Sequence, residues 1–166
     1  AGLVLLMAFW LYRGFDIHAT GFRNAEYVDL IGPFAYHAGA DGVTVLFILL
    51  GALIVFLVTL YSLVRDLPDM SRLLAVILAV EGAMMSIMTT LDMLWFVLAS
   101  GLELALVGYL VGNWSSSPDK DKAKASFYQF QGVGLAMLLA GVMILGWNYH
   151  DLSGTAWSFD LFDLAR

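Results

Sequence analysis

The amino-acid sequence predicts an all-α membrane protein, a single domain built as a bundle of transmembrane helices. Two observations carry this prediction. Hydrophobic residues make up 61% of the 166 residues and the mean hydropathy is +0.83, values typical of membrane proteins rather than soluble domains. Several apolar stretches also reach about 20 residues, the length at which a helix crosses the hydrocarbon core of a bilayer. The lipid bilayer is therefore the first expected partner.

Charge and cysteine content exclude several other classes of protein. The chain has no Cys, which excludes disulfides, thiolate metal sites and thiolate-ligated iron–sulfur clusters. The net charge is −6 and no basic cluster is present, so we expect no nucleic-acid partner. His18, His37 and His150 are too scattered to predict a metal site. No phosphate loop, dinucleotide fingerprint or haem-ligand spacing occurs, and we expect no cofactor and no redox site in this chain.

The first 41 residues divide into an apolar segment and a polar loop. Residues 1–12 are apolar but too short to span a bilayer, and we expect them to be the end of a helix that starts before Ala1. They lack the positive n-region of a signal peptide. Residues 13–41 contain glycines, Pro33 and several charges, and they predict an extramembrane loop with only a weak hairpin signal.

Four later segments are long and apolar enough to span a membrane. The first is rich in β-branched residues, yet a lone segment in lipid must be helical to satisfy its backbone groups. A tight turn at residues 65–69 follows this segment, because Pro68 cannot continue the helix, and a very short turn around Asp92 separates the second and third spans. Residues 150–166 are expected to form a closing polar loop. The predicted spans are residues 42–65, 72–91, 93–114 and 126–149.

The distribution of Lys and Arg predicts the orientation in the membrane. The turn near Pro68 and the loop of residues 113–125 hold five basic residues, against three on the other side. Cytoplasmic loops carry the excess of basic residues. We therefore expect these two loops in the cytoplasm, and residues 13–41 and 150–166 on the extracytoplasmic side.

Two carboxylic acids lie near the middle of predicted spans. Glu81 and Glu103 would each cost several kcal/mol at that depth unless they faced the protein interior or water. One hypothesis makes them proton-relay groups. The alternative is a carboxyl kept neutral by burial and hydrogen-bonded to a neighbouring Ser, Thr or backbone carbonyl.

A row of small residues follows one face of the span of residues 93–114. Such a row predicts close helix–helix packing. Glu103 lies about 200° around the helix from the first member of the row, and we expect it to point away from this seam. The row consists of Gly101, Ala105, Gly108 and Gly112.

Two further polar residues lie near the ends of spans. Gln131 is near the start of the last span, where an interhelical hydrogen bond is the simpler hypothesis and a place in a proton path is the other. Asp92 is predicted to be a helix N-cap or a solvated turn residue.

Several motifs in one register resemble the antiporter-like membrane subunits of respiratory complex I. The likeness is to the subunit M or D type, which is kin to the D subunit of cation/proton antiporters, and it runs over most of the chain. The motifs are Tyr36–Gly42, Glu81–Met84 followed by Leu91–Asp92, Tyr109–Trp114, Gln131–Leu138 and Trp157–Leu161.

This resemblance implies a place and a function for the chain. It implies a piece of a longer antiporter-like fold, from the end of the second helix through the sixth. It further implies proton translocation coupled to quinone reduction by an NADH:quinone oxidoreductase in the inner or another energy-coupling membrane. Other membrane subunits would be the partners, and the quinone would bind elsewhere in the complex.

The chain departs from the family pattern at the position of the principal carboxylate. The family has a Trp-Glu pair in its fifth helix, and the shared register places Ser100 and Gly101 there. Ala125 stands where relatives usually have Lys. An alternative hypothesis is therefore a structural or specialised relative, with its own proton channel lost or rerouted. Such a relative would serve a carbon dioxide/bicarbonate, hydrogenase or cation/proton antiporter complex.

Overall fold

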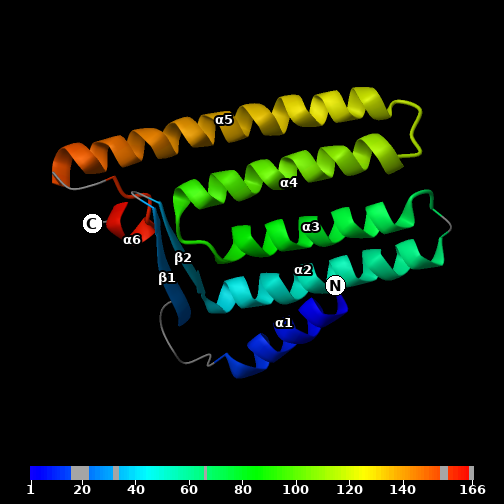
Figure 1. The fold of residues 1–166 in the computed structure, drawn as a ribbon, viewed down its shortest axis with the longest axis horizontal. Helices are drawn as coiled ribbons and strands as arrows, with labels where there is room; N and C mark the ends of the chain where they lie inside the picture. The colour runs from blue at the N-terminus through cyan, green and yellow to red at the C-terminus, as the bar shows by residue number, and fades with distance from the viewer. Residues whose placement is uncertain (16–22, 32–33, 66, 154–156, 165–166) are drawn as a thin grey trace.

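The computed structural model describes residues 1–15, 23–31, 34–65, 67–153 and 157–164. These residues form an all-α fold with one β-hairpin at one end (Figure 1). The elements are α1 (Gly2–Gly14), β1 (Arg23–Ile31), β2 (Phe34–Ala40), α2 (Gly42–Val64), α3 (Met70–Thr89), α4 (Met93–Trp114), α5 (Lys120–Ser153) and α6 (Leu161–Leu164).

The helices α1 to α5 lie side by side in chain order (Figure 1). The main helix contacts join α1 to α2, α2 to α3, α3 to α4 and α4 to α5. The short connections from α2 to α5 favour this up-and-down order, because each helix can return directly along its neighbour, whereas the hairpin lies between α1 and α2. The bundle is therefore a row of helices, with apolar surface on both of its faces.

The surface of the row suits a bilayer. Helices α2, α3, α4 and α5 are long and apolar enough to cross a membrane, and only 11% to 22% of their apolar windows is buried within the chain. Large apolar side chains such as Leu46, Leu102 and Ile144 are more than half exposed. Lipid tails or other helices must cover this surface, because contiguous apolar area of this size is not stable in water.

Aspartates begin two of the spanning helices. The Asp41 carboxylate accepts a hydrogen bond from the backbone N–H of Thr44 at 2.7 Å, at the start of α2. The Asp92 carboxylate accepts one from the backbone N–H of Trp95, also at 2.7 Å, at the start of α4. Each bond satisfies an N–H group that has no partner within the helix. The predicted N-cap role of Asp92 is confirmed, although its side chain is buried rather than solvated.

Two segments differ from the sequence-based expectation. Helix α5 begins at Lys120 and not at residue 126, because Lys, Asp and Ala before the apolar part are tolerated in a helix that extends into water. Within the predicted loop of residues 13–41, β1 and β2 form an antiparallel hairpin. Part of what holds β2 is distant in sequence, since Ala38 bridges Thr90 at the end of α3. A local pattern cannot reveal that pairing.

The small-residue face of α4 packs against α5. The Tyr128 hydroxyl donates a hydrogen bond to the Ala105 carbonyl at 3.3 Å, and the Tyr128 ring lies over Gly108, where a Cβ atom would overlap it. A Cβ atom at Gly101 would meet Leu135 at 3.5 Å, and one at Gly112 would meet Lys124 at 3.0 Å. Small residues thus let the two backbones approach.

The packing at Gly108 predicts a selective loss of stability. We expect Gly108→Ala to lower the free energy of unfolding by about 1–3 kcal/mol, because the added methyl group overlaps the Tyr128 ring. The matched control is Gly141→Ala on α5, where a Cβ atom has no neighbour within 4 Å. Thermal unfolding of the purified protein in lipid nanodiscs measures both. Equal stability of the two variants would contradict the packing argument.

Candidate functional site

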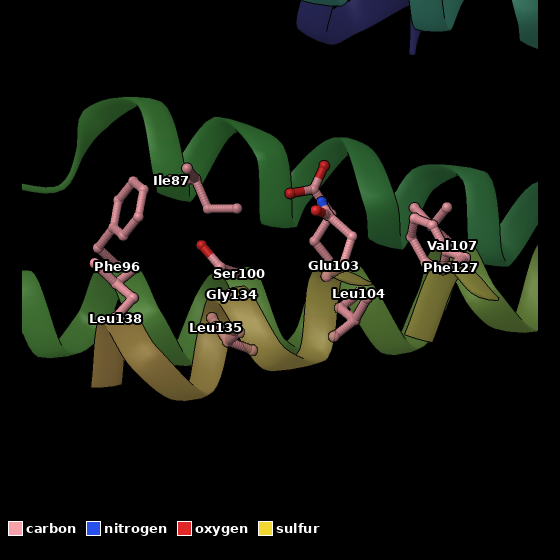
Figure 2. Close-up of a pocket in the computed structure, with 11 residues that line it drawn as sticks. Ile87, Phe96, Ser100, Glu103, Leu104, Val107, Phe127, Gly134, Leu135 and Leu138 are labelled. Atoms are coloured by element: carbon pink, nitrogen blue, oxygen red, sulfur yellow. The ribbon is translucent and has the colours of Figure 1, made fainter. Parts of the chain in front are cut away.

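A cavity of about 490 Å³ lies beside α4, between α3 and α5. Ser100 and Glu103 of α4 extend into it, and Figure 2 shows both side chains directed into the space near Ile87 of α3. Helix α5 contributes Gln131 and Leu135. Most of the remaining lining is apolar, so that the polar atoms are concentrated around one carboxyl group.

Helical spacing explains why Glu103 reaches this cavity. Phe96, Ser100, Glu103 and Val107 recur at intervals of three or four residues, and such residues share one helix face. Glu103 is partly buried on that face. The structure therefore brings Glu103 and Gln131 to one cavity, as two of the three residues predicted for a proton path.

The third predicted residue, Glu81, lies in a different environment. Its side chain is 2% exposed on α3, and its Oε2 atom is 3.3 Å from the backbone nitrogen of Ala1. Its Oε1 atom is buried with no hydrogen-bond partner among the described residues. A charged carboxylate is costly there, because burial removes its water without replacing every hydrogen bond. Glu81 does not line the cavity of Glu103.

A second group of titratable side chains lies at the end of the row that carries the hairpin. The His37 Nδ1 atom is 2.5 Å from the Asp160 Oδ2 atom, and the two residues are 123 positions apart. Asp92 forms an isolated β-bridge with Asp160. The sequence did not predict this group, because the histidines were considered only as metal ligands and were too scattered for a metal site. Its only signal was the occurrence of His37, Asp92 and Asp160 in three of the resemblance motifs.

The environment shifts the acidity of both helix-capping aspartates, in opposite directions. Hydrogen bonds from the side chain and backbone of Thr44 lower the pKa of Asp41. Burial raises the pKa of Asp92, and the nearby charge of Asp160 adds to the rise. Hydrogen bonding to Trp95 and the charge of His37 oppose it. Burial disfavours the charged form of a carboxyl group, and hydrogen bonds to that form favour it.

The described residues offer no arrangement for a metal. Within residues 1–15, 23–31, 34–65, 67–153 and 157–164, no three His, Asp or Glu side chains are placed to hold an ion. His18 lies outside the described residues. The carboxyl, hydroxyl, amide and imidazole groups at the described sites can bind protons or form hydrogen bonds.

The chain is similar to several curated proteins, two of which are described here by name. The chain is 24% identical over 161 residues to F420H2 dehydrogenase subunit M of Methanosarcina mazei, a match to 95% of this chain and 32% of that protein. It is 27% identical over 165 residues to NAD(P)H-quinone oxidoreductase chain 4 of Synechococcus elongatus, across 97% of this chain and 29% of that protein. No family model matches the chain.

Comparison with solved structures gives the same relationship. A chain of respiratory complex I from Thermus thermophilus, solved with bound NADH, matches with a TM-score of 0.78 and 26% identity. The match covers 98% of this chain and 32% of that one. The chain therefore spans about a third of the length of these relatives. It is a multi-pass membrane protein with a distant, partial likeness to complex I membrane subunits, as the sequence motifs predicted.

The buried cap of α4 predicts two different outcomes for two substitutions. Asp92→Ala removes the acceptor for the Trp95 N–H, and we expect a loss of about 1 kcal/mol in the free energy of unfolding. Asn can keep that hydrogen bond, so Asp92→Asn should retain the stability of the wild type at neutral pH. Thermal unfolding of the purified protein compares the three chains. A loss in the Asn variant as large as that in the Ala variant would contradict the capping role.

The stability of the wild type and of Asp92→Asn, measured by thermal unfolding at several pH values, tests the raised pKa of Asp92. A carboxyl group with a raised pKa in the folded state binds its proton more tightly there, so its contribution to stability declines as pH rises from the ordinary Asp value through the raised one. Asp92→Asn cannot ionise, and we expect it to lack this part of the decline.

Proposed function

We propose that the chain is part of an antiporter-like membrane subunit in a complex I-type NADH:quinone oxidoreductase, and that it contributes to proton translocation coupled to quinone reduction. The energy-coupling membrane is the site of such an assembly. Other membrane subunits are its partners, and the quinone binds in another subunit. This chain supplies proton-binding groups to the assembly.

The observation that carries the proposal is the position of Glu103. The carboxyl group lies on a membrane-spanning helix, well inside α4, and faces a cavity large enough for several water molecules. An ionisable side chain within a membrane span is a functional candidate, because its desolvation cost is otherwise unexplained. Ser100 and Gln131 supply hydroxyl and amide groups at the same cavity, and both can donate and accept hydrogen bonds. This arrangement supports proton binding at Glu103.

Glu81 supports the same function from a separate position. Its Oε1 atom is buried without a hydrogen-bond partner among the described residues, and the desolvation cost of such a carboxyl group is unexplained unless it has a function. Glu81 and Glu103 therefore act, in this proposal, as two distinct proton-binding positions.

A second candidate function follows from the residues at the family position of the principal carboxylate. Ser100 and Gly101 stand there, and Glu103 lies two residues further along the helix. The face of α4 with Gly101 and Gly108 is occupied by packing against α5. These observations favour a structural or specialised relative, whose own proton channel is lost or rerouted, in an assembly for carbon dioxide or bicarbonate, hydrogen or cations.

Conservative substitutions distinguish the two candidates. We expect Glu103→Gln and Glu81→Gln in the complete membrane assembly each to lower proton pumping about tenfold or more, because Gln has similar size and cannot carry a proton. Electron transfer to quinone in uncoupled vesicles should change little. Pumping is measured as acidification inside inverted vesicles, relative to the rate of quinone reduction.

Asp119→Asn is the matched control, because Asp119 is an exposed carboxylate in the connection before α5. It should pump at the wild-type rate. Full pumping by both glutamine variants would reject the first candidate and favour the structural one. Loss in Glu81→Gln alone would leave Glu103 without the proposed role.

A further inference from the structure

Three segments far apart in sequence meet at the hairpin end of the row (Figure 1). They are strand β2, the turn between α3 and α4, and the C-terminal stretch of residues 157–164. The Leu91 N–H donates to the His37 carbonyl at 2.7 Å, which joins the turn to the hairpin. Two bonds join the turn to the C-terminal stretch, from the Met93 N–H to the Phe159 carbonyl at 2.9 Å and from the Leu161 N–H to the Leu91 carbonyl at 3.0 Å.

The side chains at this junction are largely removed from water. Leu91 and Phe159 are 7% and 3% exposed, and Asp92 and Asp160 are 4% and 8% exposed. Phe159 belongs to an apolar cluster with Val97 of α4 and Val142 of α5. The C-terminal stretch is thus anchored on the spanning helices as well as on the turn.

One contact between side chains connects the first and last of the three segments. The His37 Nδ1 atom meets the Asp160 Oδ2 atom at 2.5 Å, and the side chains are 15% and 10% exposed. The other oxygen of Asp160 accepts the Phe162 N–H at 2.8 Å, and the Phe162 ring lies 5.5 Å from the His37 ring. The carboxylate therefore binds both its own segment and the hairpin.

The charges at the junction are unbalanced. Asp92 and Asp160 are partners in the β-bridge and repel one another, while a positive His37 attracts both. Other titratable groups lie on the elements around this pair, among them His150 of α5, whose ring stacks on Trp157. Asp163 is bonded to Ser158, Asp41 caps α2 and Glu26 is exposed opposite Ala38, while Arg23 lies opposite Ala40 in the hairpin register.

We propose that His37 and Asp160 form a proton-dependent clasp, which fastens the C-terminal stretch and the hairpin over the α3–α4 turn. A protonated His37 balances one of the two facing carboxylates and holds the clasp closed. When His37 loses that proton, two carboxylates face each other beside a neutral ring, and the clasp loosens. Histidine is the side chain that ordinarily changes charge between about pH 5 and pH 8. The clasp therefore responds to the proton concentration at this end of the membrane protein.

Hydrogen exchange in the complete membrane assembly tests the clasp. The readout is the protection of the peptides that contain Leu91, Met93 and Leu161, whose N–H groups cross the junction. After correction for the intrinsic effect of pH on exchange, we expect wild-type protection to fall about tenfold from about pH 5.5 to about pH 8. This measurement on the wild type needs no variant to fold.

Variants assign the effect to the two side chains. His37→Gln and Asp160→Asn should lower protection at about pH 5.5 to the level that the wild type shows at about pH 8, with little further change with pH. Glu26→Gln is the matched control, since it removes an exposed hairpin carboxylate outside the clasp, and it should follow the wild-type profile.

Two results would overturn the proposal: wild-type protection that is constant over this range, or an unchanged pH profile in His37→Gln. The outcome is independent of the proton path, because exchange at the junction is measured without pumping. Rejection of the clasp would not affect the proposed proton-binding roles of Glu81 and Glu103. Rejection of those roles would likewise not affect the clasp.

Discussion

The backbone inside a membrane must find its hydrogen-bond partners within the protein, and this constraint governs the whole chain. Each spanning segment satisfies it alone by forming a helix, including α2 with its many β-branched residues. The non-helical backbone is confined to the ends of the row. There the hairpin, the α3–α4 turn and the C-terminal stretch pair with one another through β-bridges and turn hydrogen bonds. The same requirement thus produces helices in the middle and a strand-like junction at one end.

The distribution of acidic groups follows the same division. Along the spans, Glu81 and Glu103 each carry a desolvation cost, and their surroundings differ, because Glu81 is fully buried on α3 and Glu103 faces an open cavity. At the ends, Asp41 and Asp92 use backbone N–H groups of the next helix, so that the carboxylates begin the spans they precede. Proton chemistry is expected where the fold leaves a carboxyl group incompletely satisfied.

The helices and their order could be predicted from the sequence, because length and apolarity decide them locally. The start of α4 was also predictable from local sequence, because Asp92 caps the helix that it directly precedes. The hairpin was only a weak signal, because Ala38 pairs with Thr90, a residue 52 positions away. Glu103 and Glu81 could be identified as candidate proton-binding residues from the sequence, because both lie near the middle of predicted spans. Which neighbours each would meet depends on helix rotation and on Tyr128 and Leu135 of α5, which no local pattern specifies. The His37–Asp160 contact spans 123 positions and was missed for that reason.

The chain-order arrangement of the helices has a consequence for how the protein is assembled. Almost every helix contact joins consecutive elements, so the contact order within the row is low, and each helical hairpin can pair as soon as its second helix has entered the membrane. The junction is different, because it needs Phe159 and Asp160 from the end of the described chain to reach Leu91 and His37. Closing that long loop costs chain entropy, which favours the pairing of neighbouring helices first. The C-terminal stretch is therefore expected to dock last among the described segments, once the helices on which it rests have paired.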